Sequence, residues 1–229
     1  EVTEIDIYDG IGFYGVTASM VKEKLADAGD VVVRINSPGG DVFDGIAIHN
    51  DLKDHDGHVT IEVVGLAASA ASIIAMAGDT IKIASNAFIM IHYASTIAWG
   101  TKEVLAEMME VLGEIDAALV ATYVARTGQS EDAVQSMMAA ETWLGAKAAV
   151  DKGFADETGK EAEPQARFDL SGFSNVPAPL RDDGSDDRRS TKRDIERVLM
   201  QDAGLHRSEA RRLMAGGFDA LSPTQAAGA

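Results

Sequence analysis

Apolar residues form short alternating or continuous runs at several places in the first 91 residues, and each run has the length of a β-strand. Between these runs, apolar residues recur every three or four positions, which is typical of helices. We therefore expect strands at 4–8, 31–35, 58–64, 80–84 and 88–91, and helices at 17–28, 41–53 and 69–77. Repeated strand–helix units of this length favour a largely parallel sheet with right-handed crossovers, so the pattern predicts an α/β fold.

Residues 101–126 are predicted to form one long helix whose apolar positions cover more than one stripe. Burial of a single face against the sheet would leave part of this apolar surface uncovered. We therefore expect the helix to pack on a second partner as well. The alternative is a helix that packs entirely within its own subunit.

The character of the chain changes after residue 158. Residues 159–190 are rich in Gly, Pro, Ser and acidic residues and are predicted to be a flexible linker. Residues 191–229 regain helical periodicity, and two short helices there would bury little apolar surface unless they dock on a partner. The predicted organisation is a domain at 1–158, the linker, and a helical tail that serves assembly or targeting.

Composition and charge exclude some classes of function. The net charge is −17, and the nine acidic and nine basic residues from Arg181 onward cancel, so the excess negative charge lies before that residue. Such a surface disfavours nucleic acid, although acidity also serves simple solubility. Cysteine is absent, which excludes a disulfide framework and a thiol nucleophile. No membrane-length apolar run or signal segment is seen, so we expect a cytoplasmic protein.

One hydroxyl stands among very small residues in the segment 65–72. Ser69 follows an alternating apolar run and precedes a predicted helix, so it is expected at a strand-to-helix junction. Backbone N–H groups at the start of that helix would favour a developing oxyanion beside an exposed nucleophile. The alternative is that the small residues only allow close packing.

Two further segments carry candidate chemistry. Asn36–Asp41 also connects a predicted strand to a helix, and Gly39 and Gly40 would present bare N–H groups to a ligand. These residue types also make ordinary turns. His92 ends the apolar run 88–91, where a histidine is either a hydrogen-bonded core residue or the base that a seryl hydroxyl needs.

Taken together and in order, these segments resemble the proteolytic subunit of the ATP-dependent Clp protease, and more closely the Clp-like prohead (head maturation) proteases of phages. The resemblance spans residues 1 to about 158. It is carried by Arg34–Gly45, Gly65–Ser69, Met90–His92 and Glu141–Ala146, with Gly153–Asp156 after them.

The resemblance implies that Ser69 is the nucleophile and His92 the general base. It also implies an oxyanion hole made by the N–H of Gly39 or Gly40 together with that of Ala70.

The acid of the implied triad departs from the family pattern. Glu141 stands where the Clp subunits have an aspartate, and a carboxylate one methylene longer can still orient an imidazole. Alternatively, Glu141 caps a helix that begins near Gly145, and Asp116 or another acid takes its place.

The implied fold is the crotonase-like superhelix of strand-strand-helix repeats, in which residues 101–126 would be the handle helix that stacks two homo-oligomeric rings. The implied function is that of a serine endopeptidase cleaving phage scaffold or capsid proteins inside assembling proheads in the host cytoplasm. No metal or nucleotide cofactor is implied, and the chain has no phosphate-binding Gly-Lys-Ser loop. Neither a membrane nor nucleic acid is an expected partner.

Other functions remain open. One is a cellular-type Clp subunit fed by an unfoldase, and another is a signal-peptide-peptidase relative that would use Lys82 or Lys147 as the base. A third is a catalytically silent scaffold subunit that keeps the fold. Crotonase-type acyl-CoA chemistry shares the fold, but the Ser69 and His92 segments match the peptidase branch. Whether Ser72 substitutes for Ser69 is not decided by the sequence.

Overall fold

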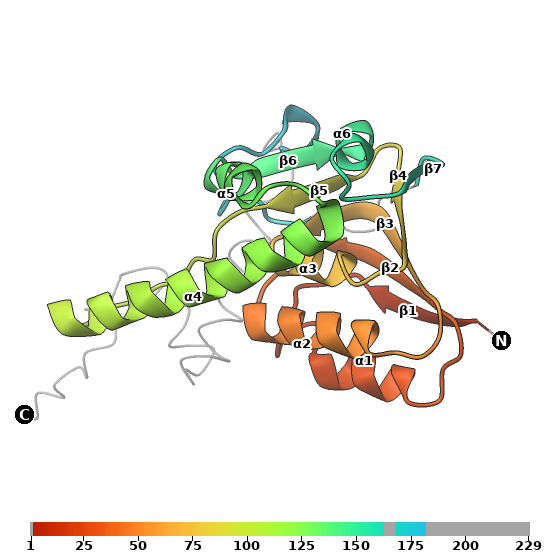
Figure 1. Ribbon diagram of the computed structural model, residues 1–229, viewed down its shortest axis with the longest axis horizontal. Coiled ribbons are helices and arrows are strands. Elements are labelled where there is room, and N and C mark those ends of the chain that lie inside the picture. The colour runs from red at the N-terminus through yellow and green to blue at the C-terminus, as the bar shows by residue number, and fades with distance from the viewer. Residues whose placement is uncertain (1, 163–167, 182–229) are drawn as a thin grey trace, which may run out of the picture. The chain divides into compact units, whose positions relative to one another are not determined.

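The computed structural model describes residues 2–162 and 168–181 (Figure 1). Residues Glu1–Leu180 form one compact unit. The tail expected at 191–229 lies outside the described residues, as do parts of the expected linker at 159–190.

Parallel pairing dominates the seven-stranded sheet. The strands paired in parallel, in spatial order, are β1 (Thr3–Ile7), β2 (Val31–Ser37), β3 (Val59–Ala68), β4 (Thr80–Ala84) and β7 (Glu157–Gly159). Strand β5 (Phe88–Ile91) pairs in parallel with the end of β3, and β6 (Thr142–Gly145) pairs antiparallel with β5. The predicted α/β fold class with a largely parallel sheet is confirmed.

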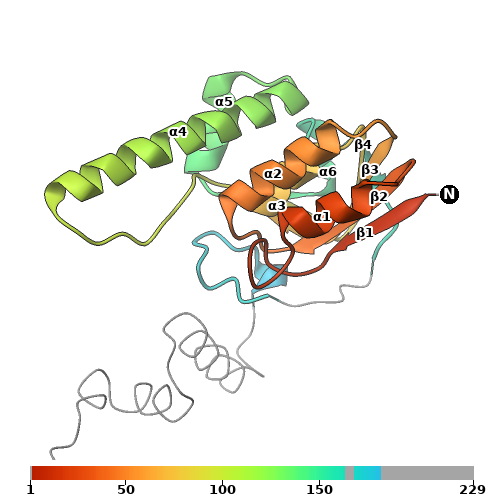
Figure 2. The ribbon, with the colours of Figure 1, turned by 90° about the horizontal axis from the view of Figure 1, so that it is seen from below.

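Six α-helices in the described part of the chain accompany this sheet. They are α1 (Ala18–Leu25), α2 (Val42–Lys53), α3 (Ala70–Ala75), α4 (Lys102–Thr127), α5 (Glu131–Ala139) and α6 (Ala146–Asp151), and a 3₁₀ turn follows at Ala178–Leu180. Helices α1 and α2 lie together on one side of the sheet, with α3 beside α2 (Figure 2). The N-cap residues Thr17 and Asp41 accept backbone N–H groups with their side chains, which fixes where α1 and α2 begin.

Strand β3 pairs with two different strands along its length, and this pairing determines where the candidate site lies. Its first part, Thr60–Val63, pairs with β4, whereas its last residues, Leu66–Ala68, pair with β5. Because β3 and β5 are parallel neighbours, the residues that follow their carboxyl ends meet at one edge of the sheet. Ser69 follows β3 and His92 follows β5, so the topology brings together two residues that are 23 positions apart.

Helix α4 has two different halves. Its second half is packed, with Leu119, Val120 and Tyr123 buried. Its first half projects beyond the sheet (Figure 1) and leaves apolar side chains exposed, including Met109, of which 73% is accessible. The described part of the subunit therefore leaves some of the apolar surface of α4 uncovered, which favours packing on a second partner over a helix packed entirely within its own subunit.

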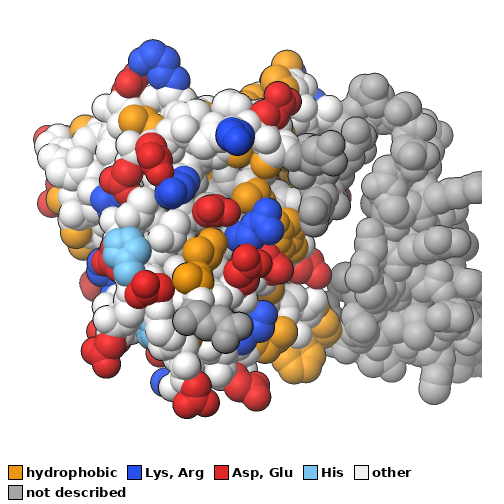
Figure 3. All heavy atoms as spheres, turned by 90° about the vertical axis from the view of Figure 1, so that its right-hand side faces the viewer, with side chains coloured by type: hydrophobic (Ala, Val, Ile, Leu, Met, Phe, Trp, Pro, Cys, Tyr) orange, Lys and Arg blue, Asp and Glu red, His pale blue; other side chains and the backbone are white. Residues whose placement is uncertain are grey.

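Acidic side chains are spread across the face of the molecule shown in Figure 3, with basic side chains between them. No helix among the described residues is long and apolar enough to cross a bilayer.

Candidate active site

Ser69 occupies the single residue between β3 and α3, where the chain turns sharply. Its backbone angles are φ 52° and ψ −125°, a conformation that costs an L-residue about 1–3 kcal/mol and persists only when the surroundings impose it. The Ser69 N–H donates to the carbonyl of Met90 at 3.0 Å, which continues the pairing of β3 with β5. This turn presents the half-buried Ser69 hydroxyl at the edge of a cavity.

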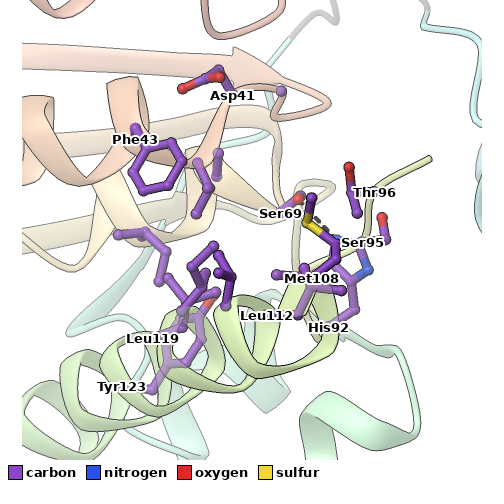
Figure 4. A pocket seen from close by; sticks show the side chains of 17 residues that line it. Asp41, Phe43, Ser69, His92, Ser95, Thr96, Met108, Leu112, Leu119 and Tyr123 are labelled. Carbon is purple, nitrogen blue, oxygen red and sulfur yellow. Dashed lines mark hydrogen bonds between the residues drawn. The ribbon is translucent and has the colours of Figure 1, made fainter. Parts of the chain in front are cut away.

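His92 lies directly beside this hydroxyl. Its Nε2 is 2.8 Å from Ser69 Oγ, a hydrogen-bond distance (Figure 4). Burial lowers the pKa of His92, and the nearby carboxylates of Glu141 and Asp116 only partly oppose that effect. The imidazole is therefore neutral at pH 7 and able to accept the seryl proton.

The turn after β2 packs against Ser69 and its neighbours. A Cβ on Gly39 would lie 2.6 Å from the Ala68 carbonyl oxygen and 2.7 Å from Ser69 Cβ, so only glycine allows this approach. The N–H of Gly39 donates to Ser37 Oγ at 3.2 Å. Of the two glycines considered for an oxyanion hole, Gly40 lines the cavity together with Ala70, whereas the N–H of Gly39 is already engaged.

A cavity of about 410 Å³ opens in front of Ser69 and His92 (Figure 4). Its opposite wall is mostly apolar and comes from α4. The lining residues are Gly40, Asp41, Val42, Phe43, Ser69, Ala70, Ile73, His92, Ala94, Ser95, Thr96, Met108, Val111, Leu112, Ile115, Leu119 and Tyr123.

Glu141 lies immediately before β6 and is held by three donors. Its Oε1 accepts the N–H of Asn175 at 2.6 Å and Trp143 Nε1–H at 3.2 Å, and its Oε2 accepts the N–H of Ser174 at 2.9 Å. Partial burial raises the pKa of Glu141, but these hydrogen bonds and nearby His92 outweigh it and the net pKa is lowered. The group is therefore a carboxylate at neutral pH. Among the described residues, no hydrogen bond joins it to His92.

The alternative that Glu141 caps a helix is wrong. Strand β6 lies between it and α6, the N-cap of α6 is Gly145, and no side chain hydrogen-bonds at that cap. The carboxylate instead binds the backbone N–H groups of a later segment.

That later segment, residues 168–176, packs beside the site although it falls within the expected linker. Phe173 makes edge-to-face contacts with His92 and Trp143, with ring centroids 5.6 and 5.7 Å apart respectively. Phe168 and Leu170 join the same apolar cluster. The two N–H groups that reach Glu141 could not be predicted from the residue types, because backbone donors do not depend on side-chain identity.

Asp116 is the other acid near the histidine. Its Oδ1 accepts the N–H of Ala94 at 2.7 Å, so it ties α4 to the loop after His92. Burial raises the pKa of Asp116, against the opposing effects of that hydrogen bond and of His92.

The remaining candidates lie elsewhere. Lys82 pairs with Glu157 at 3.1 Å, Lys147 pairs with Asp151, and neither lysine lines the cavity. Ser72 is a buried residue of α3 and does not line the cavity. Over the described ranges, no group of three or more His, Asp or Glu side chains is arranged to hold a metal ion.

A hydroxyl on a strained turn, a neutral imidazole at hydrogen-bond distance and adjacent backbone donors are the features of a serine-type hydrolase site. Comparison with known proteins agrees with that class. The family described as Clp protease matches residues 15–162, and the chain belongs to this family of serine-type peptidases.

Known proteolytic subunits are similar over somewhat more than half of the chain. The chain is 34% identical over 131 residues to ATP-dependent Clp protease proteolytic subunit 1 of Chlamydia muridarum, covering 55% of this chain and 68% of the relative. It is 33% identical over 133 residues to the ATP-dependent Clp protease proteolytic subunit of Pleurastrum terricola, covering 57% and 67%. The subunit of Chlorella vulgaris is 36% identical over 128 residues, covering 55% and 63%.

Proposed function

We propose that the protein is a serine endopeptidase in which Ser69 is the nucleophile and His92 the general base. The observation that carries the proposal is the 2.8 Å contact between Ser69 Oγ and His92 Nε2 at the mouth of the cavity. Membership of the Clp protease family supports the same chemistry.

In the first half of the reaction, Ser69 Oγ attacks the carbonyl carbon of the scissile peptide while its proton passes to His92 Nε2. The negative charge that develops on the carbonyl oxygen is stabilised by the N–H groups of Gly40 and Ala70. The imidazolium then gives its proton to the leaving nitrogen, the C–N bond breaks, and an acyl-enzyme ester remains on Ser69.

In the second half, a water molecule attacks the ester as His92 removes its proton. Ser69 is regenerated when that proton returns to Oγ and the carboxylic acid product leaves. Glu141, ionised beside the site, stabilises the His92 cation that forms in both halves.

The direct test is labelling with a fluorophosphonate probe, followed by peptide mass spectrometry to locate the modified residue. We expect the label on Ser69 in the wild-type protein and no label in Ser69→Ala or His92→Ala. An unlabelled wild-type protein in every oligomeric state would favour the catalytically silent scaffold over the peptidase.

The pH dependence of activity follows from the burial of His92. Because burial lowers its pKa, the base loses its proton at lower pH than an ordinary histidine of pKa about 6.5. We expect kcat/KM to rise with pH through a midpoint below that value, and to stay near its plateau at pH 7. The measurement is kcat/KM for a fluorogenic peptide between pH 4.5 and 8.5.

Asp116→Asn is the matched control for the pH profile. Removing a nearby negative charge destabilises the imidazolium, so the midpoint should move to still lower pH. A wild-type midpoint above 6.5, or an upward shift in Asp116→Asn, would contradict the assignment of His92 as the titrating base.

Within this chemistry, we propose that the substrates are phage scaffold or capsid proteins cleaved during prohead maturation in the host cytoplasm. The apolar wall that α4 gives to the cavity supports an extended protein segment as the substrate. A second candidate is favoured by the relatives' names, which describe proteolytic subunits of an ATP-dependent protease. A partner unfoldase would then supply the ATP dependence.

Deleting residues 181–229 separates these candidates. If the tail directs assembly, the shortened protein should cleave small peptides at the wild-type rate but should no longer enter proheads when it is co-expressed with capsid and scaffold proteins. Normal incorporation would count against the assembly role. ATP-stimulated degradation of a folded substrate with a Clp unfoldase would instead favour the second candidate.

We also propose that the protein forms homo-oligomeric rings, which stack through the exposed half of α4. Val104 and Met109 are accessible apolar residues on that half. Light scattering coupled to size-exclusion chromatography should show a species larger than the 24.2 kDa monomer, and Val104→Glu/Met109→Glu should reduce its mass. The control is Val2→Glu, at an exposed apolar residue outside α4, which should leave the mass unchanged. A concentration-independent wild-type monomer would refute self-association.

A further inference from the structure

A chain of two buried hydroxyls lies beneath the nucleophile, and the reaction scheme above does not use it. Ser72, on α3, donates its hydroxyl to the Ser69 carbonyl at 2.6 Å. The Tyr123 hydroxyl, from α4, lies 2.7 Å from Ser72 Oγ. Ser72 and Tyr123 are 0% and 1% exposed. Because Ser72 has one hydroxyl proton and gives it to Ser69, Tyr123 is the donor in the second bond.

The tyrosine is a permanent donor in this arrangement. Burial raises the pKa of Tyr123, with the hydrogen bond to Ser72 only partly opposing it, so the phenol keeps its proton across the neutral range. Hydrogen bonds in such a chain polarise one another, and the bond from Ser72 to the Ser69 carbonyl is strengthened as a result.

The Ser69 carbonyl is therefore held by two groups of one residue. It accepts the Ser72 N–H at 2.9 Å as well as the Ser72 hydroxyl. The rotation that these bonds fix is ψ of Ser69, which stands at −125° in a disfavoured region of backbone space. A strained turn of this kind needs several interactions to hold it.

Fixing this carbonyl also fixes an N–H group. The Ser69 carbonyl and the Ala70 N–H belong to one planar trans peptide, in which the two groups point in opposite directions. When Ser72 and Tyr123 hold the carbonyl on the buried side, the Ala70 N–H is directed away from them. Ala70 lines the cavity beside Ser69, where the oxyanion would form.

We propose that Ser72 and Tyr123 are positioning residues that orient the Ala70 N–H as an oxyanion donor, Tyr123 acting through Ser72. The proposal rests on the proposed peptidase function. It also answers whether Ser72 replaces Ser69 as nucleophile: its hydroxyl is buried, lies outside the cavity lining, and is committed to the Ser69 carbonyl.

A role in packing alone predicts different behaviour. The Tyr123 ring also packs against Phe154, with ring centroids 5.7 Å apart. Tyr123→Phe keeps that ring contact and removes only the hydroxyl. The variant therefore separates orientation of the peptide from filling of the core.

The experiment compares Tyr123→Phe, Ser72→Ala and the double variant with wild type, using Tyr8→Phe as the matched hydroxyl deletion at a residue outside the cavity lining. Loss of a direct oxyanion donor costs about 10²–10³ in kcat, so misdirecting one should cost less. We expect kcat for a fluorogenic peptide to fall about tenfold in Tyr123→Phe and further in Ser72→Ala. KM should stay within about twofold of wild type, since the donor acts in the transition state. Tyr8→Phe should match wild type.

Two readouts are insensitive to a merely structural role. A peptide aldehyde forms a tetrahedral adduct on Ser69 whose oxygen needs the same donor, so its affinity should weaken by the same factor as kcat, whereas binding of the matching peptide alcohol should not change. Because Tyr123 acts through Ser72, the double variant should be no worse than Ser72→Ala alone. Independent multiplication of the two losses, or a change confined to KM, would overturn the proposal.

Different results would refute the peptidase function and the positioning role of Ser72 and Tyr123. If fluorophosphonate does not label wild-type Ser69, the peptidase function fails and this proposal with it. If wild type is labelled but Tyr123→Phe keeps the wild-type kcat and aldehyde affinity, only the positioning role is refuted. Should Ser72→Ala lose its thermal transition, the isosteric Tyr123→Phe decides alone.

Discussion

Ser69→Ala is expected to lower kcat for peptide hydrolysis about a million-fold, the largest effect of any single substitution in this chain. Without Oγ there is no acyl-enzyme, and His92 is left without the proton it is placed to accept at 2.8 Å. Removal of the nucleophile of a serine triad costs about 10⁶ in kcat, and a residual rate remains from the oxyanion donors and binding. Single-turnover hydrolysis of a fluorogenic peptide at high enzyme concentration measures both rates.

The matched control is Ser95→Ala, which removes another hydroxyl from the lining of the same cavity. Its kcat should stay within about twofold of wild type, because Ser95 has no place in the proton path. If Ser69→Ala kept more than about 1% of the wild-type rate, the activity would come from another residue or from a contaminating peptidase. Repeating the assay on protein purified by a second route separates these two sources.

Local patterns were enough to predict most elements that carry the site. The apolar runs located β2, β3 and β5, but only the end of β5 was predicted correctly, since β2 continues to Ser37 and β3 to Ala68, beyond the expected ends at 35 and 64. Parallel neighbours bring their carboxyl ends to one edge. The meeting of Ser69 with His92 therefore follows once β3 is known to pair with β5.

Elements near the other side of the site were not predicted. Strand β6 has only four residues and pairs antiparallel with β5, so the repeated strand–helix pattern gave no reason to expect it. Because of this strand, Glu141 lies directly before β6 and not at the start of a helix. Short strands depend on their neighbours more than on their own sequence, which is why a pattern reading omits them.

Contacts between distant segments also could not be predicted from the sequence. Nothing in the local pattern pairs Tyr123 with Ser72, which are 51 positions apart, or brings the N–H groups of Ser174 and Asn175 to Glu141. The expected linker contains Phe168, Leu170 and Phe173, and these side chains pack against the buried cluster of Leu66, Ala68 and Met90. Composition averaged over 159–190 concealed this cluster.

Glu141→Gln is expected to lower kcat about 10²–10⁴-fold, the largest loss expected outside the Ser69–His92 pair. The substitution keeps the shape of the side chain but removes the charge that stabilises the His92 cation, and loss of a triad carboxylate costs up to about 10⁴. It also replaces one carboxylate oxygen by an NH₂ group, which is a donor and cannot accept the N–H of Ser174 or Asn175. The measurement is kcat for a fluorogenic peptide, with thermal unfolding followed in parallel.

Asp116→Asn is the matched control, because it too removes one carboxylate charge near His92. Asp116 is engaged by the Ala94 N–H, and burial raises its pKa, whereas the pKa of Glu141 is lowered by the donors around it. Of these two acids, Glu141 is thus the one that its surroundings keep ionised more strongly, and Asp116→Asn should cost less than about tenfold. A reversed order of the two losses would assign the third catalytic role to Asp116. Equal small losses would mean that Ser69 and His92 act as a dyad, with no carboxylate required to orient the base.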